Sequence, residues 1–403
     1  MTKLEQLIEE LCPNGVEFKK VKDVFKRLKG TPITAGKMKE IENPNGEIKI
    51  FAGGKTVIDA YEEDIPKANI TRVPAVLVQS RGVIDAVYYE KPFTFKNEMW
   101  AYTHENKTAV KYLYYVLKNN MEKFREAASG MGSLPQISLK VTEDFLIPVP
   151  PLPVQSEIVR ILDNFTELTA ELTAELTARK KQYEFYRDKL LTFGDARGGA
   201  TSDVVWRTLA EIADISTGSS NTDDAVEGGC YPFFVRSQQP LAKDEYEYDE
   251  EAIITAGDGV GVGKVFHYIN GKYALHQRAY RIHPATDGLL GKYLYHYFVA
   301  TFPKYIGQQM YQGSVPSIRR PMLNKFQVAI PSLDVQKRIV NVLDNFDAIC
   351  SDLKIGLPAE IEARKKQYEF YRDALLTYAA TGKIILTDRQ TDRQTDRQTI
   401  ITH

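Results

Sequence analysis

The feature that most constrains the fold is an internal repeat that covers most of the chain. The segment Gly132-Ser-Leu-Pro-Gln-Ile returns 181 residues later as Gly313-Ser-Val-Pro-Ser-Ile, and Leu162-Asp-Asn-Phe returns at the same distance as Leu343-Asp-Asn-Phe. From Ala178 the distance becomes 185, and the stretch ARKKQYEFYRD recurs letter for letter. Such a repeat predicts two copies of one structural unit, related by a pseudo-two-fold.

Between the matching segments the two copies diverge, so each copy has a variable part and a near-identical part. The repeat predicts variable domains at 1–150 and 196–330, near-identical segments at 151–195 and 331–380, and a tail at 381–403. Because 403 residues is ample for two domains, each variable part is long enough to bury its own core.

The variable domains combine strand and helix signals. Pro74-Ala-Val-Leu-Val and Glu251-Ala-Ile-Ile-Thr resemble buried strands, and each is followed by a Gly-containing turn and a second β-rich run. These patterns predict hairpins, and Tyr112–Ala127 and Lys292–Phe302 predict helices. The expected fold class is therefore α/β in the mixed α+β sense, with two globular domains.

The near-identical segments predict long helices. Apolar residues recur every three or four positions, so the first helix should run from about Val154 to Phe193 and measure ~60 Å at ~1.5 Å per residue. A small domain cannot cover an apolar stripe of that length, so we expect the second copy, Val335–Tyr378, to pack against it as a coiled coil. Gly356 and Pro358 predict a break in that second copy.

The residues assigned to the spacer and the coiled-coil seam are apolar residues of these two segments: Leu168, Leu172, Leu176, Leu343, Phe346 and Leu353. From periodicity alone, a structural spacer or a dimerisation rod is the simplest interpretation of such a helix pair. The simplest interpretation of the aromatic residues of ARKKQYEFYRD is likewise that they are packing residues.

The four-residue unit TAEL occurs in tandem at Thr169–Leu172 and Thr173–Leu176. Four residues advance a helix by ~6 Å with a net rotation of ~40°, so adding or removing one unit lengthens or shortens the helix while its leucine stays near the seam. The change of repeat distance from 181 to 185 shows that four-residue length changes are tolerated here. The alternative is a neutral expansion in a solvent-tolerant helix.

Composition limits the remaining possibilities. The cysteines Cys12, Cys230 and Cys350 lie far apart with no CxxC spacing, which argues against a disulfide framework or a structural zinc site. No apolar run approaches the ~18 residues of a membrane span, and no signal peptide is evident, so we expect a cytoplasmic protein. The net charge is −1, so any DNA binding needs local basic loops or a basic partner.

Catalytic motifs are absent from the sequence. Asn43-Pro-Asn-Gly lacks the second proline and the aromatic residue of the tetrapeptide that amino-methyltransferases use on a flipped base. The glycine-rich stretch Gly257–Lys264 fails the spacing of a P-loop and reads as a hairpin turn. The six histidines show no metal-ligand spacing. Dispersed carboxylates still leave open a stand-alone DNA-acting enzyme, either a methyltransferase or a nuclease.

Together, the doubled plan, the runs GSLPQIS, IPVPPLPVQSEIVRILDNF and LPAEIEARKKQYEFYRD, and the paired long helices resemble the specificity (S) subunit of type I restriction-modification enzymes. The TAEL tandem resembles the type IC subgroup. The resemblance covers nearly the whole chain and is most specific in the two near-identical regions. In the variable domains it rests on position and a few turns.

The resemblance implies that each variable domain is a target recognition domain that reads one half of a bipartite, asymmetric double-stranded DNA target. It implies that the helices form an antiparallel coiled coil, which sets the half-site spacing and docks two modification (methyltransferase) subunits. The subunit itself is then not an enzyme and holds no cofactor or metal. S-adenosylmethionine belongs to the modification subunits, and ATP and Mg to partner subunits that include the restriction subunits.

In such a protein, base reading needs Arg, Lys, Asn and Gln side chains at loop tips. The residues we predict to contact DNA are Lys29, Lys55, Gln79, Arg81, Lys96, Asn97 and Gln136 in the first domain, and Arg236, Gln238, Gln239, Lys264, Gln277, Arg278, Arg319 and Arg320 in the second. Taken singly, each is also typical of an ordinary surface position. A coiled-coil scaffold without a DNA role is the remaining alternative.

The tail contains the repetitive run TDRQTDRQTDRQT, which is polar and predicts disorder.

Overall fold

The computed structural model of the protein describes residues 3–129, 134–193, 204–308 and 316–381. Apart from its first residue, the predicted tail lies outside these ranges. The chain divides into two compact units: unit 1 comprises Met1–Glu171 and Ile361–His403, and unit 2 comprises Leu172–Glu360. The division passes through the long helices of the near-identical segments, so each unit holds one variable domain and parts of both helical copies.

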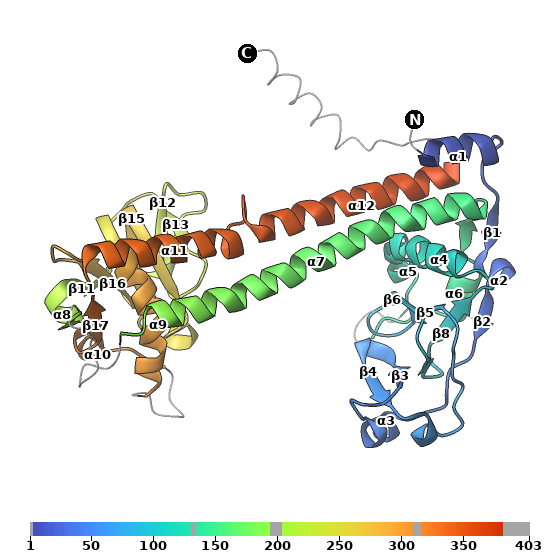
Figure 1. The fold of residues 1–403 in the computed structure, drawn as a ribbon, viewed down its shortest axis with the longest axis horizontal. Helices are drawn as coiled ribbons and strands as arrows, with labels where there is room; N and C mark the ends of the chain where they lie inside the picture. Colours follow the sequence, from blue (N-terminus) through green and yellow to red (C-terminus); the bar gives the residue numbers. More distant parts are fainter. Residues whose placement is uncertain (1–2, 130–133, 194–203, 309–315, 382–403) are drawn as a thin grey trace, which may run out of the picture. The chain divides into compact units, whose positions relative to one another are not determined.

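Unit 1 is built on a four-stranded antiparallel sheet with the order β2-β8-β5-β6. Helix α4 packs on β5, β6 and β8 of this sheet (Figure 1). A three-stranded sheet, β4-β3-β7, and a ribbon of β1 and β9 complete the unit. Its elements are α1 (Lys3–Leu11), β1 (Phe18–Lys20), α2 (Val21–Val24), β2 (Lys26–Leu28), α3 (Ala35–Ile41), β3 (Ile48–Phe51), η1 (Gly53–Lys55), β4 (Val57–Ala60), η2 (Glu62–Asp64), β5 (Ala75–Gln79), β6 (Asp85–Tyr89), β7 (Phe93–Phe95), β8 (Trp100–Thr103), α4 (Lys107–Asn119), α5 (Met121–Glu126), α6 (Leu139–Glu143) and β9 (Leu146–Pro148).

Unit 2 repeats this plan with different side chains. Its six-stranded sheet has the order β11-β16-β14-β15-β12-β13, and β10 pairs with β17 as β1 pairs with β9. Helix α9 packs on β14, β15 and β16. The elements are β10 (Val205–Thr208), α8 (Leu209–Ile212), β11 (Ala213–Thr217), η3 (Thr222–Asp224), β12 (Tyr231–Phe234), β13 (Leu241–Lys243), β14 (Tyr248–Ala256), η4 (Gly259–Gly261), β15 (Phe266–Leu275), β16 (Ala279–Pro284), α9 (Gly291–Gly307), α10 (Arg320–Asn324) and β17 (Gln327–Ile330).

One difference separates the two sheets. In unit 1, β3 pairs in parallel with the short strand β7, whereas in unit 2 β12 pairs in parallel with the end of the long strand β15. Pro92 lies between β6 and β7, and a proline cannot donate a ladder hydrogen bond, so the strand is interrupted there. The corresponding stretch of unit 2 has no proline, and β15 runs through it. The predicted hairpins are confirmed as β5–β6 and β14–β15.

The near-identical segments form the constant helices: α7 (Leu152–Leu190), α11 (Leu333–Ser351) and α12 (Leu357–Thr381). The predicted break is confirmed between α11 and α12, where the side chain of Asp352 accepts the backbone N–H of Lys354 at 2.6 Å. The next helix begins beside Pro358, which is compatible with a first helical turn and not with a helix interior.

Both helical copies contribute buried side chains to each domain core. In unit 1, Leu162 near the start of α7 and Leu376 near the end of α12 belong to the core that contains α4. In unit 2, Leu191, just after α7, and Leu343 of α11 belong to the core that contains α9. The ring of Phe165 stacks on that of Tyr371 in unit 1, and Tyr186 stacks on Phe346 in unit 2. Within each unit, the two copies therefore pack side by side and run antiparallel (Figure 1).

Among the described residues, no helix is both long enough and apolar enough to cross a membrane.

Candidate nucleic-acid interface

Five loops of unit 1 converge at one place, and we call them the first loop cluster: residues 29–31, 53–55, 80–82, 96–98 and 134–137. Backbone bridges join Arg81 to Gln136 and Thr31 to Lys96. The N–H of Ile137 donates to the carbonyl of Ser80 at 2.9 Å, and the Ser80 hydroxyl donates to the carbonyl of Glu98 at 2.6 Å. Segments far apart in the sequence are thus fixed to one another at the loop tips.

Unit 2 forms the second loop cluster from the corresponding loops: residues 218–221, 236–239, 257–261, 276–278 and 316–319. Bridges join Asp258 to Ser317 and Ser220 to His276. The N–H of Ile318 donates to the carbonyl of Gly257 at 2.7 Å, which matches the bond from Ile137 in the first cluster. The two domains therefore bring equivalent loops together, although the side chains on them differ.

Most of the predicted DNA contacts lie in these clusters. The first cluster contains Lys29, Lys55, Arg81, Lys96, Asn97 and Gln136, and the second contains Arg236, Gln238, Gln239, Gln277, Arg278 and Arg319. All are exposed except Lys96 and Arg236, which are half-buried. The whole chain is close to neutral, yet each cluster presents exposed basic and amide side chains.

Three of the predicted contacts lie outside the clusters. Gln79 is the last residue of the central strand β5 and is only 4% exposed, because every residue of that strand is buried. Lys264 is exposed and follows η4, and Arg320 is exposed as the first residue of α10. The direct contacts of all fifteen residues with DNA remain predictions.

The second cluster contains a charged group that sequence reasoning missed. The carboxylate of Asp258 lies 2.7 Å from the guanidinium of Arg236 and 3.3 Å from that of Arg278. A carboxylate shared by two arginines restricts how their planar guanidinium groups can point, and arginine reads guanine through two parallel hydrogen bonds. Asp258 lies in the glycine-rich stretch Gly257–Lys264, whose sequence pattern indicates no more than a hairpin turn.

His276 lies beside these arginines. Its Nδ1 accepts the backbone N–H of Arg278 at 2.9 Å. Burial, and then the positive charges of Arg236 and Arg278, lower the pKa of His276 below its usual value. The ring is therefore neutral near pH 7 and serves as a hydrogen-bond acceptor in the turn. In the first cluster, the equivalent position is occupied by Lys96, whose ammonium pairs with Glu98 at 3.0 Å.

Both clusters depend on a left-handed turn residue. Gly82 has φ 76° and Gly259 has φ 78°, and their N–H groups donate to Pro135 and Pro316 respectively at 2.9 Å. A residue with a Cβ is disfavoured at such φ values, so glycine lets the β5–β6 and β14–β15 turns meet the neighbouring loop.

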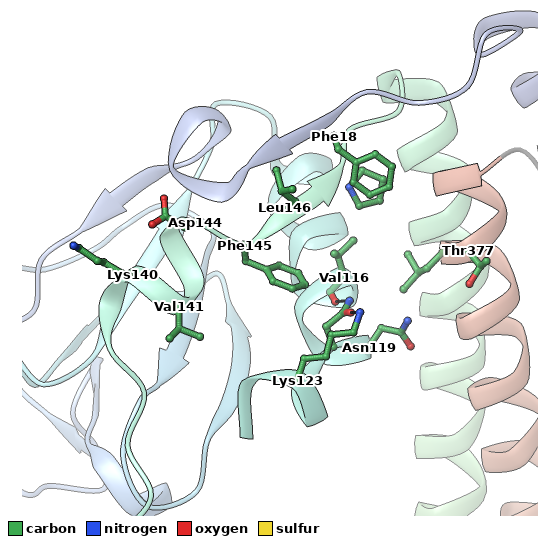
Figure 2. A pocket seen from close by; sticks show the side chains of 13 residues that line it. Phe18, Val116, Asn119, Lys123, Lys140, Val141, Asp144, Phe145, Leu146 and Thr377 are labelled. Atoms are coloured by element: carbon green, nitrogen blue, oxygen red, sulfur yellow. Dashed lines mark hydrogen bonds between the residues drawn. The ribbon is translucent and has the colours of Figure 1, made fainter. Parts of the chain in front are cut away.

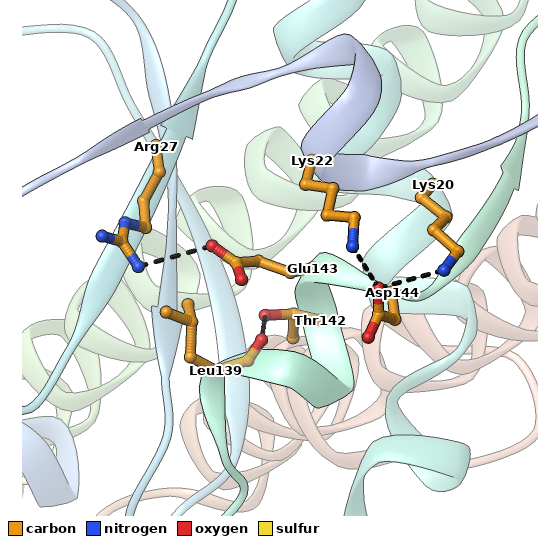
Figure 3. Close-up of polar contacts among 7 residues, drawn as sticks. All are labelled: Lys20, Lys22, Arg27, Leu139, Thr142, Glu143 and Asp144. Carbon is orange, nitrogen blue, oxygen red and sulfur yellow. Dashed lines mark hydrogen bonds and ion pairs between the residues drawn. The ribbon is translucent and has the colours of Figure 1, made fainter.

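A hollow of about 650 Å³ in unit 1 has a different character (Figure 2). Val116, Phe145 and Leu376 give it apolar walls, and its charged lining residues are Lys123, Lys140 and Asp144. The Asp144 carboxylate accepts hydrogen bonds from Lys22 at 2.7 Å and from Lys20 at 3.2 Å (Figure 3). These hydrogen bonds, that from Lys22 foremost, lower the pKa of Asp144. Its carboxylate is therefore ionised and already paired.

A second ion pair of that region joins Arg27 to Glu143 at 3.4 Å (Figure 3). Together these ion pairs tie Glu143 of α6 and the following Asp144 to β1, α2 and β2. Neither supplies an unengaged acid or base. Within the described ranges, no three His, Cys, Asp or Glu side chains are grouped so as to hold a metal ion.

The spacer residues fall into two groups. Leu168, Leu172 and Leu176 are half-buried along α7, Leu343 is fully buried, and Phe346 stacks on Tyr186. Leu353 does not belong to the seam, which corrects the prediction. It is 80% exposed and lies between α11 and α12, because the helical periodicity does not continue past Ser351.

The fold defines a doubled protein, with one loop cluster on each of two domains that share a pair of constant helical segments. The family model described as "Type I restriction modification DNA specificity domain" matches residues 13–179 and, a second time, 201–363. The chain belongs to this family. It is a DNA-specificity subunit of a type I restriction-modification system and not an enzyme, which agrees with the resemblance found in the sequence.

Individual relatives support the same assignment. The chain is 32% identical over 363 residues to the specificity subunit of the type I restriction enzyme EcoR124I/EcoR124II from Escherichia coli, covering 82% of this chain and 87% of that one. It is 32% identical to a putative type I restriction enzyme specificity subunit of Haemophilus influenzae, covering 70% and 77% respectively. The first similarity is consistent with the type IC resemblance.

The crystal structure of the S subunit of a type I restriction-modification system from M. genitalium has a similar fold. It superposes with a TM-score of 0.60 at 18% identity, covering 93% of this chain and 98% of that one.

Proposed function

We propose that each loop cluster reads one half of a bipartite, asymmetric DNA target. The observation that carries this proposal is the equivalence of the clusters: in both units, equivalent backbone hydrogen bonds and bridges join equivalent loops, while the exposed side chains differ. Two domains that recognise different base sequences need the same backbone scaffold but different exposed side chains. This is because each base pair presents its own pattern of hydrogen-bond donors and acceptors in the major groove.

The constant helices then set the distance between the half-sites and dock two modification subunits. Two equivalent docking faces are supported by equivalent exposed aromatic residues: Phe185 is 61% exposed in unit 2, and Phe370, its copy, is 39% exposed in unit 1. Exposed aromatic side chains are enriched at protein interfaces. The TAEL units change the length of α7 in steps of ~6 Å, which suits a spacer.

The chemistry of such a complex belongs to other subunits. We propose that S-adenosylmethionine is bound by the modification subunits, and that ATP and Mg are used by partner subunits, among them restriction subunits. The specificity subunit contributes recognition and positioning, and it acts on double-stranded DNA in the cytoplasm.

The test is to map methylated sites for the complex with its cognate modification subunits, with one variant in each cluster. Arg81→Ala should relax base selection in one half-site, and Arg278→Ala in the other. Each lost contact should reduce discrimination roughly 5- to 150-fold, which corresponds to about 1–3 kcal/mol. Lys39→Ala and Lys325→Ala are matched controls, since both lysines are exposed and lie outside the clusters.

If both arginine variants altered the same half-site, or neither altered either half-site, the assignment of one cluster to each half-site would fail. Methyl transfer by the isolated chain would instead favour a stand-alone DNA-acting enzyme. A complex that methylated DNA with unchanged specificity in the absence of this chain would leave only a scaffold role.

A further inference from the structure

A polar junction joins the variable domain of unit 1 to constant helix α7. The carboxylate of Asp163 on α7 accepts a hydrogen bond from the Tyr115 hydroxyl at 2.5 Å and pairs with the Lys111 ammonium at 2.8 Å. Both partners lie on α4, the helix that covers the sheet of the variable domain. The same ammonium lies 5.3 Å from the ring centre of Tyr88 on β6. One carboxylate thus connects the constant helix, α4 and the sheet.

Unit 2 contains the same junction, built from equivalent positions. Asp344 on α11 lies 2.8 Å from Nε2 of His296 and 3.3 Å from the ammonium of Lys292, and both partners lie on α9. The Lys292 ammonium lies 4.9 Å from the ring centre of Tyr268 on β15. Asp163, Lys111 and Tyr115 correspond to these three residues at the repeat distance of 181, and only the Tyr–His position differs in type.

The other helical copy contributes one tyrosine to each of the two cores. Tyr368 of α12 packs against the core of unit 1, and Tyr183 of α7 packs against the core of unit 2. These two tyrosines are the same residue of ARKKQYEFYRD in its two copies. Burial is the main cause that raises the pKa of each, and the negative charge of Asp163 or Asp344 contributes to the same rise. One repeated tyrosine is therefore influenced by the charge of each repeated aspartate.

The placement of this junction argues for a role in geometry. Ion pairs that are partly open to solvent add little to stability, because water screens them and because two side chains must be ordered. Apolar contacts between helices leave sliding and rotation comparatively free, whereas hydrogen bonds to a carboxylate have preferred directions and lengths. A contact that recurs in both units, between otherwise diverged domains and near-identical helices, is suited to fixing orientation.

We propose that Asp163 and Asp344 are positioning residues that fix the orientation of each variable domain on its constant helix. This inference rests on the proposed function of the loop clusters as half-site readers. The orientation of a domain decides where its loop cluster meets the groove, so the junctions control which half-site spacing is accepted. They do not control which bases are read.

The test uses Asp163→Asn and Asp344→Asn, each in the complex with the modification subunits. Binding is measured to duplexes with the cognate gap and with gaps one base pair shorter and longer. We expect the preference for the cognate gap over its neighbours to fall about fivefold in each variant, as for the loss of a directly coupled pair. The preference for the correct half-site bases should stay unchanged.

Two controls make the result specific. Asp347→Asn removes an exposed carboxylate of α11 near the junction and should leave the gap preference intact. His296→Tyr gives unit 2 the partner that unit 1 already has, so it should keep the gap preference.

If Asp163→Asn and Asp344→Asn weakened binding equally at every gap, the aspartates would serve stability alone and the inference would fall. If the two variants altered the half-site bases, the claim that the junctions control spacing and not base selection would be wrong. Failure of the proposed function is distinguished by Arg81→Ala and Arg278→Ala, which test base reading without touching either junction.

Discussion

Units 1 and 2 share the backbone hydrogen bonds of their loop clusters and differ in the side chains that these loops expose. The turn Lys96-Asn97-Glu98 and the turn His276-Gln277-Arg278 are held by the same backbone bonds, since the first residue of each donates to the end of the neighbouring strand at 2.9 Å. Yet the first turn carries a Lys–Glu pair, and the second carries an arginine of the Arg–Asp–Arg group. The comparison teaches that the frame is set by backbone bonding, which leaves the exposed groups free to change.

The opposite holds where the variable domains meet the constant helices. There the two units have nearly the same side chains. Lysine and aspartate occupy equivalent positions in both units, and the third position is tyrosine in unit 1 and histidine in unit 2. We expect this contrast if the loop clusters select bases and the junctions fix the orientation of each variable domain on its constant helix.

The largest expected effect tests whether the two cores are equivalent. Leu162 and Leu343 are the same repeat position, and both are completely buried. Leu162→Ala should destabilise unit 1, and Leu343→Ala unit 2, each by about 2–5 kcal/mol, because a buried leucine loses its burial energy and leaves a cavity. Hydrogen exchange resolved by peptide measures each unit separately. A large loss in one unit with none in the other would break the equivalence.

An intermediate effect is expected at the acids of the loop clusters. Asp258→Asn should lower discrimination at the half-site read by unit 2 about tenfold, because two arginines lose the charge that orients them. Glu98→Gln should lower discrimination at the other half-site only about twofold, since Lys96 is a point charge with less directional bonding. Competition binding with single-base variants of each half-site measures both. Equal effects would show that the two clusters read DNA in the same manner.

The smallest effect is a pH dependence confined to unit 2. Burial lowers the pKa of His296, so the unfolded chain binds a proton more readily than the folded unit does. Stability is then complete above the unfolded pKa of about 6.5 and declines as the pH falls below it, by less than about 1 kcal/mol. Hydrogen exchange at pH 7.5 and 5.5 should show this loss in unit 2, and His296→Tyr should reduce it. An equal loss in the variant would assign the effect to other groups.

The internal repeat sufficed to predict the doubled architecture, and local patterns sufficed to predict its elements. The helix break depended on Gly356 and Pro358, and the hairpins depended on short apolar runs beside glycine turns, so both could be predicted from neighbouring residues. Burial and helix ends could not be predicted in this way, because tertiary structure decides them. Gln79 is expected at a loop tip but ends a strand that is buried along its whole length, and Leu353 follows a helix that has already ended.

The junctions were missed for a similar reason. Lys111 and Asp163 are separated by most of α4, by α5 and α6, and by the start of α7, so no local pattern connects them. A signal was nevertheless present, because Lys111-Tyr-Leu-Tyr recurs as Lys292-Tyr-Leu-Tyr at the repeat distance of the aspartates. Asp258 gave no comparable signal, since its two arginine partners come from different loops.

The most direct test of the central claim, one reader built twice on a helical spacer, is the deletion of Thr173–Leu176 in the complex with its modification subunits. Methylated sites are mapped for the parent and the variant. Removing four residues shortens the helix by ~6 Å and keeps the leucine face, so both half-sites should retain their bases while the unspecified gap becomes shorter. Changed half-site bases, or an unchanged gap with full methylation, would contradict the account.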